Sequence, residues 1–223
     1  MSRGPDAGST EGDGVDRDIV DLTRPVESGM PTYPGDPEVR IEPHATHTDD
    51  GYRVSRIALG SHAGTHVDAP AHTEPDGATL GSFSLADLRF RARVVDCRGA
   101  GANEAIGAAA LDPLPLDDVG AVVFRTGWSD AWGTGRMTDH PYLAPETARR
   151  CAEAGVAVAV DALSPDPTGG DGFDAHRALL GAGLPIVENV RDLGTLPDRA
   201  FELCVVPLAV DVDGAPARVF ARV

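Results

Sequence analysis

The sequence contains no lysine, and all 19 of its basic residues are arginine. A lysine amine is needed for Schiff-base catalysis, for pyridoxal phosphate attachment and for the phosphate-binding P-loop, so these chemistries are excluded. The Gly-x-Ser-x-Gly nucleophile elbow of serine hydrolases is also absent. With a formal net charge of −16, the chain lacks the cationic surface that nucleic acids and anionic membranes require, and we expect neither as a partner.

Cysteine and long hydrophobic runs are equally scarce. The three cysteines, Cys97, Cys151 and Cys204, are far apart and form no CxxC pair or disulfide framework, so we interpret them as small buried hydrophobes. No apolar run approaches the ~18 residues that span a bilayer, and the first residues lack the apolar core of a secretory signal. We therefore expect a cytoplasmic location.

What the sequence does contain is a cluster of ligand-type residues between Ser61 and His72, which reads S-H-A-G-T-H-V-D-A-P-A-H. Imidazole and carboxylate groups suit zinc, manganese or iron. Because a strand repeats every two residues, His66 and Asp68 would project from one face, and a bend at Gly64 would let His62 join them. A histidine-rich surface loop is the alternative. The carboxylate between two histidines favours a metal site.

The pattern H-x-G-T-H-x-D-x-P-x-H in this segment resembles the signature of the cyclase family, which includes the metal-dependent bacterial kynurenine formamidases, and isatin hydrolases are similar to these. The resemblance extends from Ile19 to the C-terminus. A second match lies about a hundred residues later, where His176 and Glu188 reproduce the family's H-x-x-L-L…E-N spacing.

The resemblance implies roles for individual residues. His62, His66, Asp68, His176 and Glu188 would hold zinc or manganese, and these five suffice for two ions if Asp68 bridges them. His72 would be the general acid and base, which suits an imidazole with an ordinary pKa near 6.5. Substrate-binding residues would be Tyr33, in Y-P-G-D where the family usually has tryptophan, and Trp128, in R-T-G-W. From the residues alone, Trp128 would be interpreted as a packing residue.

Hydrophobic patterning predicts a single α/β domain over residues 18–223, with a disordered tail at 1–17. We expect strands at 19–23, 92–98, 119–128, 155–161 and 184–190, a half-buried strand at 52–60, helices at 103–111 and 144–155, and two C-terminal strands joined at Asp213-Gly214. The loop 164–174 is expected to be a flexible rim. The strand–helix–strand order around 144–155 predicts some parallel pairing in a mixed sheet with few short helices. The family resemblance implies a swivelling β/β/α arrangement and a homodimer or homotetramer.

These features predict an enzyme that acts on a small molecule. We expect metal-dependent hydrolysis of a C–N bond in an aryl formamide, a lactam or a related amide. The alternatives are a cyclase or dehydratase of secondary metabolism that uses the same metal site, and a binding protein that has kept the fold without catalysis. Retention of His72 beside a full ligand set argues against the binding protein, because binding needs no proton shuttle.

Overall fold

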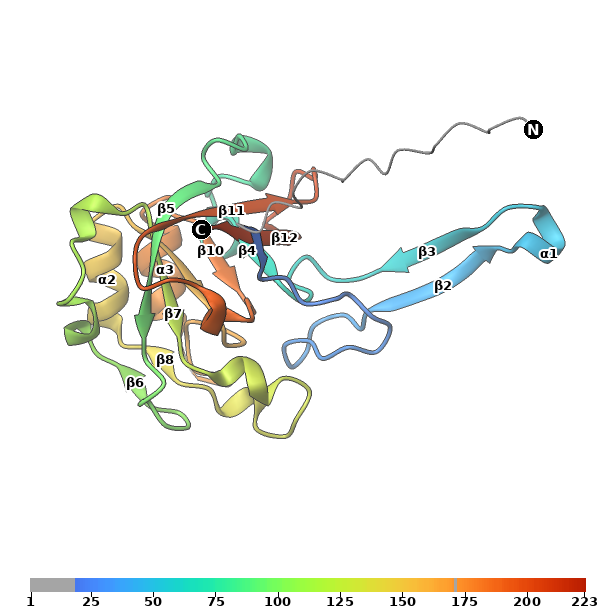
Figure 1. Cartoon of the computed structure of the whole chain (residues 1–223). Coiled ribbons are helices and arrows are strands. Elements are labelled where there is room, and N and C mark those ends of the chain that lie inside the picture. Colours follow the sequence, from blue (N-terminus) through green and yellow to red (C-terminus); the bar gives the residue numbers. More distant parts are fainter. Residues whose placement is uncertain (1–18, 171) are drawn as a thin grey trace, which may run out of the picture.

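A mixed eight-stranded sheet that closes on itself forms the centre of the computed structural model, which describes residues 19–170 and 172–223 (Figure 1). The strand order is β1-β12-β11-β5-β7-β9-β10-β4, and β4 also pairs with β12, so every strand except β1 lies in a barrel-like ring. The predicted tail at 1–17 lies outside the described residues. The strands of this sheet are β1 (Ile19–Asp21), β4 (His66–Asp68), β5 (Arg89–Asp96), β7 (Ala121–Arg125), β9 (Ala157–Val160), β10 (Ile186–Glu188), β11 (Phe201–Pro207) and β12 (Gly214–Arg222).

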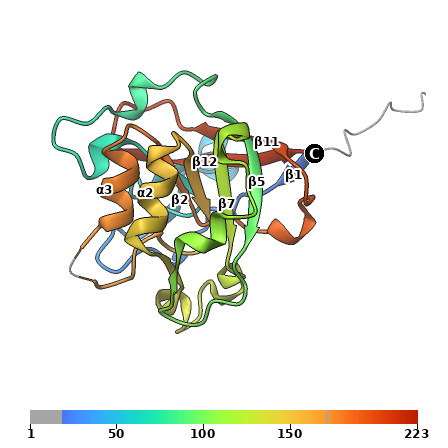
Figure 2. The same ribbon diagram turned by 90° about the vertical axis from the view of Figure 1, so that its left-hand side faces the viewer.

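The helices are few and short. The α-helices are α1 (His47–Asp50), α2 (Pro145–Glu153) and α3 (Asp174–Leu180), and the 3-10 turns are η1 (Pro70–His72), η2 (Leu80–Ser82), η3 (Ala108–Leu111), η4 (Leu116–Asp118), η5 (Trp128–Ala131), η6 (Met137–Asp139) and η7 (Leu193–Thr195). Helices α2 and α3 lie side by side against one face of the sheet (Figures 1 and 2). None of the helices in the described part of the chain has the length and apolar character needed to span a membrane.

Strands β7 and β9 lie within the strands expected at 119–128 and 155–161, and both are buried on both faces. Ala121 and Val123 of β7 face the core inside the barrel, whereas Val122 and Phe124 face the second core, under α2 and α3. In β9, the small residues Ala157 and Ala159 likewise point inward and Val158 and Val160 point to the helices, which suits a narrow barrel interior. The pairs β5–β7, β7–β9 and β9–β10 are parallel and the other pairs of this sheet are antiparallel. The predicted crossover through 144–155 and the mixed α/β sheet are therefore confirmed.

A hairpin stands apart from this body. Strands β2 (Arg40–Ala45) and β3 (Val54–Ala58), with α1 at their tip, form an arm, residues 40–58, that extends away from the sheet (Figure 1). We expected a half-buried strand at 52–60. The strand exists, but β3 is exposed along its whole length because it pairs only with β2 among the described residues.

Two other expectations were wrong. Residues 103–111 do not form one helix: Asn103 has a φ of 55°, and the short strand β6 (Ala105–Ile106) pairs with β8 (Tyr142–Leu143) before η3 begins. The backbone carbonyl of Ile106 accepts hydrogen bonds from Ala144 and Thr147, which fixes this segment as extended chain. The two C-terminal strands pair antiparallel as expected, but residues 208–213 form the connection, so Asp213-Gly214 is its end and not a tight turn.

Candidate metal centre

Strands β4 and β10 place the first ligand-type side chains. Val67, in the middle of β4, is fully buried in the barrel core, so His66 and Asp68 on either side of it project from the opposite face. In the antiparallel pairing of β10 with β4, Glu188 lies directly opposite His66. Directly opposed side chains in such a pair are neighbours, so three ligand-type residues share one small area.

Gly64 and helix α3 bring in two further histidines. Gly64 has a φ of +66°, the left-handed conformation that glycine adopts without strain, and the resulting bend places His62 Nδ1 at 2.7 Å from Asp68 Oδ1. His176 projects from α3, where its Nε2 lies 3.3 Å from Glu188 Oε1 and 3.7 Å from Asp68 Oδ2. The structure therefore brings together all five residues that the sequence predicted as ligands.

The five form two overlapping groups of potential ligands. His62, His66 and Asp68 make one group, and Asp68, His176 and Glu188 make the other, so that Asp68 belongs to both. His66 Nε2 lies 3.2 Å from Asp68 Oδ1 and 3.3 Å from Glu188 Oε2, between the two carboxylates. Asp68 is completely buried, and His66, His176 and Glu188 are at most 5% exposed.

Each of the three histidines has one ring nitrogen held by a protein acceptor. His66 Nδ1 lies 2.9 Å from the Gly64 carbonyl oxygen, and His176 Nδ1 lies 2.6 Å from Asp166 Oδ2. His62 Nε2 lies 2.8 Å from Asp213 Oδ2. Metal-binding histidines are oriented in this way, since the second nitrogen is then left without a proton and faces the ion.

The remaining polar atoms of the site point to a cation. Within the described residues, His66 Nε2, Asp68 Oδ2 and Glu188 Oε1 are buried and make no hydrogen bond. A buried carboxylate oxygen or imidazole nitrogen without a hydrogen bond is costly, and bound divalent ions would offset that cost. The donor set of imidazoles and carboxylates fits such an ion.

Electrostatics in the metal-free protein agree with this geometry. Burial by itself would lower the pKa of His66 and of His176, but the carboxylates beside them raise both pKa values well above the ordinary value for histidine. Burial by itself would raise the pKa of Asp68, but His66, His176 and His62 hold it well below the usual range. The buried carboxylates thus favour positive charge beside them, which a bound dication would supply.

A pocket opens over these groups. His72, from the turn η1 that follows β4, lines it together with His62, His66, His176 and Glu188, and Tyr33, Leu163 and Phe173 supply apolar surface. Burial lowers the pKa of His72, so its ring is neutral at pH 7.

The structure does not bring Trp128 to this pocket. Its indole nitrogen donates to the carbonyl oxygen of Arg136, whose guanidinium lies 4.9 Å from the ring, and Trp128 lines a separate surface depression. The substrate role predicted for Trp128 is therefore not supported, and packing explains the residue. Phe173, which the sequence did not single out, contributes the second aromatic ring of the pocket.

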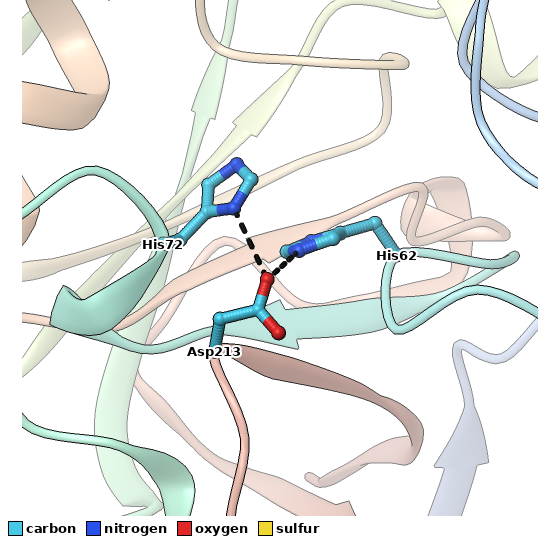
Figure 3. Close-up of side chains that lie close together, drawn as sticks. All are labelled: His62, His72 and Asp213. Atoms are coloured by element: carbon cyan, nitrogen blue, oxygen red, sulfur yellow. Dashed lines mark hydrogen bonds and ion pairs between the residues drawn. The ribbon is translucent and has the colours of Figure 1, made fainter.

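Two carboxylates of the site were also not predicted. Asp166 was assigned to a flexible rim loop, but it is 3% exposed and accepts hydrogen bonds from the backbone of Ala175 and His176 as well as from the His176 ring. Its place in the loop that leads to the helix carrying His176 was the available signal. Asp213 lies between His62 and His72 (Figure 3). In the sequence, the only signal for Asp213 was its position directly before the last expected strand.

Comparison with known proteins agrees with the fold and identifies the family. The family model described as "Putative cyclase" matches residues 20–167. Kynurenine formamidase from Paracidovorax citrulli is 32% identical to this chain, and the alignment covers 92% of this chain and 97% of the formamidase. A solved structure titled as a potential metal-dependent hydrolase with cyclase activity is 30% identical, with a TM-score of 0.76 over 91% of this chain and 96% of that one. Isatin hydrolase A from Labrenzia aggregata, 24% identical, has the same fold, with a TM-score of 0.81 over 91% of this chain and 92% of that one. The chain therefore belongs to the cyclase family, as the motif at residues 62–72 and the later pair His176 and Glu188 suggested.

Proposed function

We propose that this protein is a metal-dependent amidohydrolase that cleaves the C–N bond of a small aryl formamide, a lactam or a related amide. The observation that carries the proposal is the convergence of three buried, unpartnered ligand atoms on a pocket that also holds His72. The full-length similarity to a kynurenine formamidase supports an aryl formamide as the first substrate to test.

The residues fit two ions, zinc or manganese, held in the two groups that share Asp68. His62, His66 and Asp68 would hold one, and Asp68, His176 and Glu188 the other. A divalent metal, when bound, lowers the pKa of its water to about 7 and polarises a substrate carbonyl. The buried carboxylates Asp68 and Glu188 supply two negative charges that offset part of the charge of the ions.

The chain's own residues supply the other requirements of hydrolysis. Cleavage of an amide consumes one water: its oxygen bonds to the carbonyl carbon, the C–N bond breaks, and the departing nitrogen gains a proton. His72, neutral at pH 7, can accept a proton from the water and return it to that nitrogen. The apolar side chains of Tyr33, Leu163 and Phe173 give an aryl ring a surface on which to pack.

The test combines metal analysis with a substrate panel. We expect the purified protein to contain zinc or manganese and to hydrolyse formyl-anilides such as N-formylkynurenine, with isatin as the lactam probe, and to lose this activity with a chelator. His72→Asn should keep the metal and lose about 10²- to 10⁴-fold in turnover, the range for a general acid or base.

Other outcomes would decide against the proposal. If the metal-loaded protein leaves every amide intact but cyclises or dehydrates a substrate, the cyclase alternative is supported. If the metal-loaded protein turns over no substrate at all, a binding role is supported. Loss of metal from His72→Asn, equal to its loss of activity, would make His72 a ligand instead of a proton carrier.

A further inference from the structure

We propose that Asp213 is the positioning residue for His72: its carboxylate fixes the orientation and tautomer of that ring beside the metal centre. This inference rests on the proposed function, in which His72 moves the proton. Among the described residues, Asp213 is the carboxylate that lies within 4 Å of a ring nitrogen of His72, with Oδ2 at 3.5 Å from Nδ1.

The same oxygen also holds His62. Asp213 Oδ2 lies 2.8 Å from His62 Nε2, and the His62 and His72 rings are stacked with centroids 4.0 Å apart and a tilt of 41° (Figure 3). One carboxylate oxygen therefore faces one nitrogen of each ring. Because His62 offers its other nitrogen to Asp68, Asp213 connects the candidate ligand His62 to the candidate proton carrier His72.

The backbone delivers Asp213 to this place with little freedom. Its carbonyl oxygen accepts a hydrogen bond of 2.8 Å from the Ala69 N–H, and the next residue, Gly214, pairs with Asp68 at the start of β12. A Cβ atom at position 214 would lie 2.7 Å from His62 Cε1, so only glycine permits this approach. The close packing of Gly214 on the His62 ring holds the Asp213 side chain at the edge of both imidazoles.

The chemical consequence follows from the tautomer of His72. A carboxylate beside Nδ1 favours a proton on that nitrogen, which leaves Nε2 free to accept and return a proton. In Asp213→Asn, the amide oxygen that keeps the contact with His62 Nε2 would face His72 Nδ1 as well, but it lacks the full negative charge of the carboxylate. The exchange would therefore weaken the preference for the Nδ1 tautomer without removing a side chain.

The experiment is a double-mutant cycle in the metal-loaded enzyme, with Asp213→Asn, His72→Asn and the double variant assayed at saturating metal. We expect Asp213→Asn to lower kcat by about 10- to 100-fold with KM nearly unchanged, the range for an outer carboxylate. In the His72→Asn background, the same change should cost nothing further, because residues acting as one unit are non-additive. Asp211→Asn is the matched control, since Asp211 lies in the same connection, is exposed and accepts from Thr79.

A spectroscopic readout separates this role from simple support of the fold. Nitrogen NMR of the zinc-loaded protein should show His72 protonated on Nδ1 in the wild type and a larger share of the Nε2-protonated tautomer in Asp213→Asn. Zinc affinity should fall by about 10- to 100-fold, as expected for an outer partner of His62, and saturating metal in the assay offsets this loss.

Three results would overturn the inference. Full recovery of kcat with excess metal would mean that Asp213 acts through His62 alone. An independent loss in the His72→Asn background would separate Asp213 from His72, and loss of a whole metal equivalent would make Asp213 a ligand. If instead His72→Asn is fully active, the proton-transfer part of the proposed function fails, whereas a fully active Asp213→Asn beside an impaired His72→Asn removes only this inference.

Discussion

At the scale of single residues, Asp166 is the outer partner of His176, and its removal tests how far the second group of ligands depends on orientation. Its carboxylate holds the ring and the first turn of α3 together. Asp166→Asn should weaken zinc binding by about 10- to 100-fold and leave circular dichroism unchanged. Asp174→Asn, at an exposed position in the first turn of α3, is the control. Calorimetric titration that gives equal affinities would show that the His176 ring needs no such support.

Glu188 and His176 test whether the second group exists as one unit. Glu188→Gln keeps the shape of the side chain but loses the charge that offsets a dication, so we expect fewer bound metal equivalents or much weaker binding. His176→Ala should have the same effect, and the double variant should be little worse than either one. If elemental analysis finds the wild-type number of metal equivalents in Glu188→Gln and the variant keeps full turnover, the two-ion arrangement is wrong.

The sequence revealed the ligand-type residues better than the residues that orient them. His62, His66, Asp68 and His72 sit in one short motif, and His176 and Glu188 repeat a family spacing, so pattern alone could find them. Asp166 and Asp213 act through contacts that the tertiary fold creates, across 10 and 151 positions to His176 and His62, respectively. The polar loop around Asp166 also looked mobile, because composition does not show that its first half is buried.

At the scale of elements, strands buried on both faces were the easiest to predict and should be the least tolerant of change. Phe124 of β7 is fully buried between the sheet and the helices. Phe124→Ala should lower the free energy of unfolding by about 3 to 5 kcal/mol, through lost burial and the cavity left behind. Leu85→Ala, at a side chain that is 62% exposed, should change it by less than about 0.5 kcal/mol in the same urea titration. Similar losses in the two variants would contradict this assignment of the core.

Elements whose partners are distant in sequence were harder to predict. The segment 103–111 has the composition of a short helix, but pairing of β6 with β8 overrides that local preference. The strand at 54–58 mixes β-branched and polar residues, which normally indicates one buried face. Its exposure follows from its place in the arm, which no local pattern reveals.

At the scale of the whole molecule, the metal-free protein should become less stable as the pH rises above about 6.5, the ordinary pKa of histidine. His66 and His176 have folded-state pKa values well above that value, so their contribution is complete below pH 6.5 and is lost as the pH passes through the raised values. In chelator-treated protein, the unfolding temperature should be lower at pH 9 than at pH 6.5. In metal-loaded protein, the unfolding temperature should change little between these two pH values. An equal decline in both forms would contradict proton–metal exchange at these rings.

The arm bears on assembly, for which a homodimer or homotetramer stays our prediction. Tyr52 and Ile57 of the arm are 57% and 60% exposed, and a lone two-stranded hairpin is marginally stable in water. We expect light scattering to give a mass above that of one chain, and Ile57→Asp to reduce it. Leu85→Asp, at an equally exposed site on the body, should leave the mass unchanged. A monomeric wild type would refute the prediction.

The closure of the barrel by β4 and β12 also sets an order of events during synthesis. The motif at residues 62–72 leaves the ribosome early, but its strand is flanked on one side by β10 and on the other by β12. At roughly 5 to 20 residues per second, the ribosome takes several seconds or more to make the intervening chain. Until Glu188 and then Asp213 emerge, the nascent polypeptide has the histidines of the motif but lacks a ligand and an outer partner of the site. We therefore expect the ions to bind only after β12 has been made and has paired with β4, and a chain interrupted before β12 to lack this closure.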